Sequence, residues 1–172
     1  MNEQAAVLSS DSPLATEVRR LAATVTASHY PTGDRAALRR WAPGQPVPLA
    51  FYRLWLRHMR SDLPPESQTN AWIALAWSIA TLGAGGHVPQ RSLGQALAES
   101  GFSEGRLERL LSAPEEVHLE LFMSAVRLLA AKGKGFDLLD AARFLLTTDA
   151  AKREGIYRRI AEGFYRYLPK NN

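Results

Sequence analysis

Apolar residues recur at three- and four-residue spacing along most of the chain, and this is the period of an α-helix. The first clear stripe follows Ser12 and Pro13 and consists of Leu14, Val18, Leu21, Ala22 and Val25. Ser12 is a favourable N-cap, and Pro13 suits the first helical position because its fixed φ angle is already helical. The pattern predicts a helix that begins at Pro13 and buries one face.

The same periodicity and cap signals predict helices along the rest of the chain. Three aspartates are expected to cap helices, Asp34, Asp137 and Asp149, and Ser92 and Ser103 are each expected to begin one. Ser112 with Glu115 three residues later has the spacing of a capping box. No segment alternates with period two, and no repeat of 20–50 residues is visible. We therefore predict an all-α fold, a helical bundle of about nine helices, with the spans after the first at 35–41, 49–59, 70–82, 93–99, 104–111, from Ser112 to Gly133, 138–146 and from Asp149 onward.

Residues 70–82 are apolar nearly all round, which is typical of a central helix. The apolar stretch is shorter than the roughly 20 residues of a bilayer span, so we expect a buried core helix and no membrane contact. Glycines at 83, 85 and 86 follow it and predict a boundary between an N-terminal helical lobe, 12–86, and a C-terminal helical lobe, 87–172. Residues 1–11 lack the pattern of a secretion signal and are expected to form a disordered leader.

The composition favours a globular, cytoplasmic protein. Hydrophobic residues make up 46% and charged residues 22% of the 172 residues, values close to the globular average. The chain has no cysteine, which excludes disulfides, thiol nucleophiles and thiolate metal sites. Nothing in this composition requires an oxidising compartment, so the cytoplasm is the expected location.

Catalytic and metal-binding patterns are missing from the sequence. The four histidines, at 29, 58, 87 and 118, are scattered, and none pairs with a second ligand at the spacing of a helical metal site. Glu115, Glu116 and Glu120 lie at a predicted helix start, where the helix dipole accounts for them. We expect no enzyme activity, no cofactor and no metal.

The basic residues are the most informative chemical feature. The chain has 21 cationic side chains and a net charge of +4, and 17 of the cations are arginines. An arginine guanidinium engages phosphate oxygens in pairs and can also stack on bases, which lysine cannot do. Solvated helix faces would explain the same charges, so the pattern by itself leaves nucleic-acid binding and a bland surface both open.

Local motifs resemble those of a known family. GDRAALRR at 33–40 followed by AFYRL at 50–54, and SLGQALAESG at 92–101 followed by SEGR at 103–106, are similar to segments of the small subunit of the type I-E CRISPR complex Cascade, the CasB family. The segments FDLL at 136–139 and FYRY at 164–167 match the closing part of that family in kind. The resemblance covers roughly residues 15–168.

The resemblance implies a non-catalytic, two-lobed helical subunit that binds the guide RNA (crRNA) and the target DNA, including its displaced non-target strand. It also implies assembly with other Cascade subunits and self-association as a pair. Base pairing by the RNA would supply sequence specificity, and the protein would hold backbone phosphates. The positions that match the family's basic residues are Arg40, Arg53, Arg106, Arg127, Lys152 and Arg153. Neighbouring candidates for the same nucleic-acid-binding role are Arg39, Arg109 and Lys134.

An alternative interpretation is a helical protein-protein interaction adaptor or regulator. Aromatic and arginine side chains are favoured at protein interfaces, and this chain has four tryptophans that could dock a partner. Residues of this type lie more often in the core. The four positions are Trp41, Trp55, Trp72 and Trp77.

Overall fold

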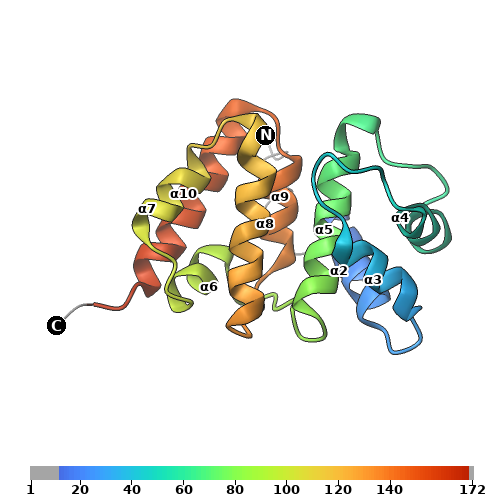
Figure 1. Ribbon diagram of the computed structural model, residues 1–172. Coiled ribbons are helices and arrows are strands. Elements are labelled where there is room, and N and C mark those ends of the chain that lie inside the picture. Colours follow the sequence, from blue (N-terminus) through green and yellow to red (C-terminus); the bar gives the residue numbers. More distant parts are fainter. Residues whose placement is uncertain (1–11, 171–172) are drawn as a thin grey trace.

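The computed structural model describes residues 12–170 and contains nine α-helices in that range (Figure 1). They are α2 (Pro13–Thr26), α3 (Thr32–Arg40), α4 (Leu49–Leu54), α5 (Thr69–Leu82), α6 (Leu93–Glu99), α7 (Glu104–Leu111), α8 (Glu115–Ala131), α9 (Leu138–Leu146) and α10 (Ala150–Tyr167). The described part of the chain has no β-strand, only an isolated parallel bridge between His87 and Phe136. The predicted all-α bundle is confirmed, whereas the expected leader, 1–11, lies outside the described residues.

Most of the predicted helix starts are made by the expected caps. In five helices a Ser or Asp side chain accepts a hydrogen bond from a backbone N–H of the first turn, which satisfies one of the four donors that a helix start leaves unpaired. The caps are Ser12, Ser92, Ser103, Asp137 and Asp149. Gly83 and Gly133 follow α5 and α8 with φ angles of 75° and 65°, a conformation that favours glycine.

The predicted capping box at Ser112 is wrong. Ser112 ends α7, and its hydroxyl donates to the carbonyl oxygen of Glu108 at 2.7 Å. Helix α8 begins only at Glu115, after Pro114 in an extended conformation. The physical reason is Pro114, because a proline disfavours helical backbone at the residue before it and so prevents Ala113 from starting the helix.

Two other predicted details also change. Helix α3 begins at Thr32, so Asp34 lies within the first turn and does not cap the helix. The predicted helix 49–59 is α4 followed by a π-helical turn, η1 (Trp55–Met59), and a 3₁₀ turn, η2 (Glu66–Gln68), leads into α5.

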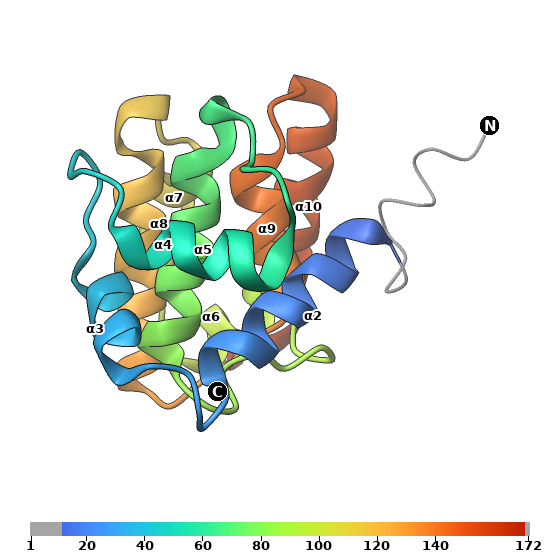
Figure 2. The same ribbon diagram turned by 90° about the vertical axis from the view of Figure 1, so that its right-hand side faces the viewer.

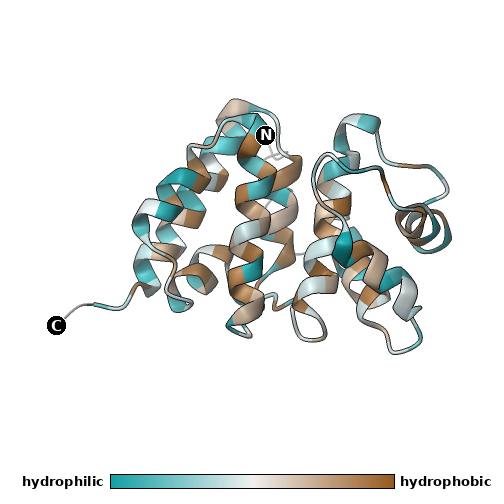
Figure 3. Ribbon diagram, viewed as in Figure 1, coloured by the Kyte–Doolittle hydropathy of each residue, from teal (hydrophilic) through white to brown (hydrophobic). Residues whose placement is uncertain are grey.

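Helix α5 is the centre of the hydrophobic core. All residues from Trp72 to Ala80 are buried, and α5 packs against α2, α3, α8 and α9. Views from two sides show α5 among these helices, and hydrophobic residues gather on the sides where helices meet (Figures 2 and 3). The four tryptophans are 2–4% exposed, so they belong to the core and cannot serve as the docking groups of the alternative interpretation.

No helix within residues 12–170 combines the length and the apolar character that crossing a bilayer requires.

Helices α6 and α10 approach each other through two glycines. A Cβ atom on Gly94 of α6 would lie 2.1 Å from the carbonyl oxygen of Ile160 on α10. A Cβ atom on Gly163 of α10 would lie 2.8 Å from the hydroxyl oxygen of Ser92. The absence of side chains at these two positions therefore permits backbone-to-backbone contact between the helices.

The glycine-rich connection after α5 is held against the segment that precedes α9. Phe136 donates its backbone N–H to Gly86, and Val88 and Asp137 donate theirs to Phe136 and Arg91, at 2.7–3.0 Å. The division into lobes 12–86 and 87–172 stays a prediction. Separate expression of the two ranges, followed by circular dichroism, would test it.

Candidate nucleic-acid interface

The nine predicted basic residues divide into two groups by their acidic neighbours. Arg53, Lys134 and Arg153 form ion pairs, whereas the other six make none with any residue between 12 and 170. All six of these side chains are exposed, so each presents an uncompensated positive charge to solvent. The six are Arg39, Arg40, Arg106, Arg109, Arg127 and Lys152.

Arg53 on α4 is engaged by Asp34 on α3. Its Nη2 and Nε atoms donate to the two carboxylate oxygens at 2.6 and 3.3 Å. The hydrogen bond to this carboxylate is the main reason that the pKa of Arg53 is raised. Because Asp34 already occupies the Nε and Nη2 donors, which form one edge of the guanidinium, Arg53 has less free charge for phosphate than its sequence motif suggests.

Lys134 and Arg153 are compensated in the same way. Lys134, after α8, lies 3.8 Å from Glu99, which also pairs with Arg91. Arg153 in the first turn of α10 lies 3.5 Å from Glu115 and donates through Nε to the carbonyl oxygen of Thr147. Lys152 is beside it and exposed. These residues lie at helix ends.

Trp77 of α5 connects the arginines of α3 with the arginine of α8. Its indole Nε1 donates to the backbone carbonyl of Arg39 at 3.2 Å. On the same ring, the guanidinium carbon of Arg127 lies 5.2 Å from the centroid. Such a cation–π contact contributes roughly 0.5–1 kcal/mol at an exposed site. The backbone of Arg39 and the side chain of Arg127 therefore meet at one indole, although 88 positions separate the two residues along the chain. Arg40 follows Arg39 at the end of α3.

A hollow of about 270 Å³ between α7 and α8 continues this surface. Ser124 lines it and lies one helical turn before Arg127 on α8, so the two share a helix face. Across the hollow, Arg106 and Arg109 are three residues apart on α7 and also lie on one face. The guanidinium carbon of Arg106 stacks 4.6 Å from the ring centroid of Phe102.

An acid that could neutralise the α7 arginines is directed elsewhere. Glu104 lies near Tyr165 of α10, and its carboxylate is the main cause of the raised pKa of the Tyr165 hydroxyl. Arg106 and Arg109 make no ion pair among the described residues.

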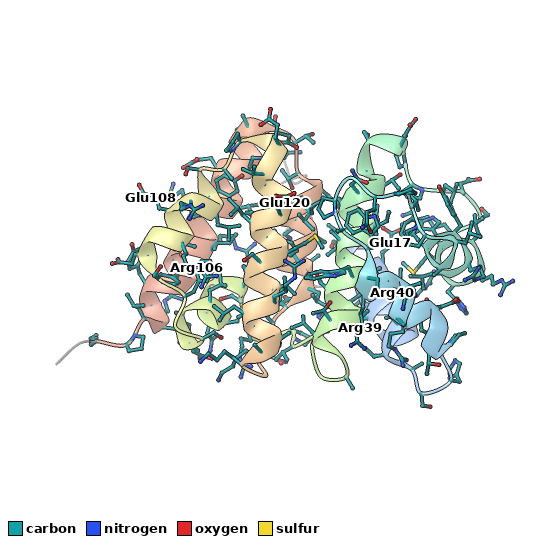
Figure 4. All side chains as sticks on the ribbon, viewed as in Figure 1. Glu17, Arg39, Arg40, Arg106, Glu108 and Glu120 are labelled. Atoms are coloured by element: carbon teal, nitrogen blue, oxygen red, sulfur yellow. The ribbon has the colours of Figure 1, made fainter. Side chains whose placement is uncertain are left out.

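We name the resulting surface the arginine band and define it by Arg39, Arg40, Arg127, Arg106 and Arg109. It runs from α3 across α5 and α8 to α7. Figure 4 shows Arg39 and Arg40 on α3 and Arg106 on α7, with α5 and α8 between them in this view. The sequence alone does not reveal the link through Trp77, or that Phe102 and Ser124 line one hollow, because both depend on how the helices pack.

One histidine is buried, a second is half-buried, and both have lowered pKa values. His87 accepts the backbone N–H of Leu138, and burial lowers its pKa more than nearby Asp137 raises it. His118 stacks on Phe144 with centroids 4.4 Å apart, and burial is again the main cause of its lowered pKa. Across residues 12–170 no cluster of three or more histidine or carboxylate side chains is placed to hold a metal ion.

We expect the free energy of unfolding to decrease as pH falls from about 7.5 to about 5.5. The histidine pKa values are lower in the folded protein than in the unfolded chain, so the unfolded chain binds more protons in this range. The contribution of the two histidines to stability is therefore fully present above their ordinary pKa of about 6.5 and is lost as pH falls below it. Urea unfolding at several pH values measures the slope.

His118→Gln is the matched variant for this pH prediction. Glutamine retains a polar group near the Tyr157 hydroxyl but does not titrate, so the decrease between the two pH values should become smaller. A flat profile in the original protein, or an unchanged slope in the variant, would contradict the role assigned to the buried imidazoles.

The fold and the surface together define a class: an all-helical protein whose distinctive chemistry, within residues 12–170, is an exposed arginine band. Comparison with protein families identifies a family within this class. Residues 34–165, most of the chain, match the family of CRISPR-associated protein Cse2, and the chain belongs to this family. The resemblance to the small subunit of type I-E Cascade is confirmed, and membership makes the chain a structural subunit of a CRISPR Cascade complex. Comparison with curated proteins and with solved structures gives no match.

Proposed function

We propose that this Cascade subunit binds the sugar-phosphate backbone of the crRNA and target DNA, stabilises the R-loop and holds the displaced non-target strand, without catalysis. The observation that carries the proposal is the arginine band, in which five exposed guanidinium groups from three helices have no acidic partner among the described residues. Guanidinium groups of this kind bind phosphate in a way that depends on charge and shape, not on sequence.

Salt dependence tests this proposal. We expect the purified chain to bind single-stranded DNA weakly, with an affinity that falls steeply as salt rises, because each neutralised phosphate releases counterions. If all five band arginines contact phosphates, the slope of log affinity against log salt should be roughly −3.5 for a single strand. Filter binding at several salt concentrations measures it. Absent binding, or binding that is indifferent to salt, would contradict the proposal.

The remaining basic candidates support the proposal to different degrees. Lys152 is exposed and free of ion pairs within the described residues, so it extends the basic surface to the start of α10. Three candidates must give up a carboxylate partner before they can bind a phosphate: Arg53, Lys134 and Arg153. The loss of the ion pair offsets part of the free energy that is gained from the phosphate.

Protein contacts within Cascade are a second part of the proposal. Leu49 on α4 and Leu56 on η1 are large apolar side chains that are 69% and 48% exposed. We propose that this edge serves contacts with other Cascade subunits or with a second copy of the chain. Co-purification of the full chain with Cascade subunits, compared with a Leu49→Ser and Leu56→Ser variant, tests the assignment.

A further inference from the structure

The hollow between α7 and α8 has the size and lining of a small ligand site. Its volume of about 270 Å³ is near the lower limit of roughly 300–1,000 Å³ for small-molecule sites, and it far exceeds the roughly 30 Å³ that one water occupies. Apolar and polar groups both line it: Phe102, Arg106, Arg109, Leu110, Leu121 and Ser124. The space therefore suits one small planar group with polar edges.

The lining offers stacking and hydrogen bonding together. Phe102 is buried and supports one face of the Arg106 guanidinium, which holds this planar group in place. The opposite face of the guanidinium is then available to an aromatic ring, since arginine stacks on rings as well as pairing with anions. The hydroxyl of Ser124 can both donate and accept, and it makes no hydrogen bond within residues 12–170.

The charges around the hollow favour a nucleic acid over an apolar protein segment. Arg106 and Arg109 border it on α7, and Arg127 lies one helical turn beyond Ser124 on α8. A ring inserted here would bring phosphates of its own strand beside these guanidinium groups. Unpaired bases supply a planar ring, polar edges and flanking phosphates in one ligand.

We propose that this hollow receives one unpaired nucleobase of a single-stranded nucleic acid, which stacks on the Arg106 guanidinium and meets the Ser124 hydroxyl. The inference rests on the proposed backbone binding and adds contact with bases to it. The contact is tolerant of sequence, because every base has a face that can stack.

The test compares two strands of equal length and charge, about ten thymidines and about ten abasic units, by fluorescence anisotropy on the full chain. We expect the thymidine strand to bind at least fivefold more tightly, the lower end of measured base stacking. Ser124→Leu fills the hollow with a group that cannot stack on a base, so it should remove this preference while changing the affinity for the abasic strand less than twofold. Ser124→Ala is the control and should retain most of the preference.

A second variant keeps the test independent of folding defects in the Ser124 variant. Arg106→Lys preserves the charge but lacks the planar group, so the ratio of thymidine affinity to abasic affinity should fall to about one, even where binding of both strands weakens. Equal binding of both strands by the original protein, with a normal salt slope, would overturn the base site. The hollow would then be assigned to a protein side chain, and the proposed backbone binding would remain. Binding of neither strand would remove both proposals. Equal weakening of both strands in both variants would also overturn the base site.

Discussion

Gly94→Ala is expected to destabilise the folded protein by about 3 kcal/mol, because overpacking a rigid helix contact typically costs 1–3 kcal/mol and here the obstruction is backbone. The added Cβ would lie 2.1 Å from the carbonyl oxygen of Ile160 and 2.7 Å from the backbone nitrogen of Phe164. Neither atom can rotate away, so α6 and α10 must separate. For a chain of this length the melting temperature should fall by about 6–12 °C.

Gly155→Ala is the matched control for this prediction. Gly155 lies within α10, and no heavy atom is within 4 Å of the position that its Cβ would take. Replacing an unobstructed helical glycine with alanine stabilises a helix by roughly 0.5–1 kcal/mol, so the same substitution should have the opposite sign here. Urea unfolding of both variants decides the matter. A Gly94→Ala protein within 0.5 kcal/mol of the original would show that α6 and α10 do not require the close contact.

The separation of α6 and α10 should also disturb the candidate interface. Ile160 and Phe164 of α10 are buried in the core, and Tyr165 of α10 lies near Glu104 of α7. A shift of α10 would therefore move Arg106 relative to the arginines of α8. Helix α10 therefore couples the effect of the Gly94 substitution on stability to the geometry of the arginine band.

The fold was predictable where its causes are local. Ser12, Ser103 and Asp149 cap helices as expected because the cap, its N–H partner and the apolar stripe lie within a few residues of one another. The prediction failed at Ser112, where the capping-box spacing is present but Pro114 opposes helical backbone at Ala113. Two local signals competed there, and the steric restriction dominated.

The candidate site was predictable only as a set of residue types. Arg106 and Arg109 were both candidates, and the helix that carries them has the predicted bounds. The connection of Arg39 to Arg127 through Trp77 joins three helices and leaves no local pattern in the sequence. The Asp34–Arg53 pair is equally non-local, and it reduces the weight of a residue that the motif placed among the strongest candidates.

This difference between free and paired arginines changes which substitutions should matter. Arg53→Gln removes a guanidinium that Asp34 already occupies, so its loss should weaken nucleic-acid binding less than loss of a band arginine. It also leaves Asp34 without its cation, which is a cost to folding and not to recognition.

The combined reversal Arg106→Glu and Arg127→Glu is expected to reduce affinity for single-stranded DNA on the order of a hundredfold at low salt. Two phosphate contacts are lost, and two like charges then face the strand. The salt slope should become shallower by about 1.4, which is the value for two phosphates on a single strand. In assembled Cascade the same variant should weaken R-loop formation.

A variant with the same total charge but a different location separates the arginine band from overall electrostatics. Arg57 on η1 and Arg158 on α10 are exposed, lie outside the arginine band and make no ion pair within residues 12–170. Arg57→Glu with Arg158→Glu lowers the net charge equally, yet it should leave the salt slope nearly unchanged, because attraction at long range is screened beyond roughly 10 Å. Circular dichroism is the control that checks whether both variants are folded. Equal losses in the two variants would mean that net charge, not a continuous surface of guanidinium groups, governs binding, and the arginine band would lose its assigned role.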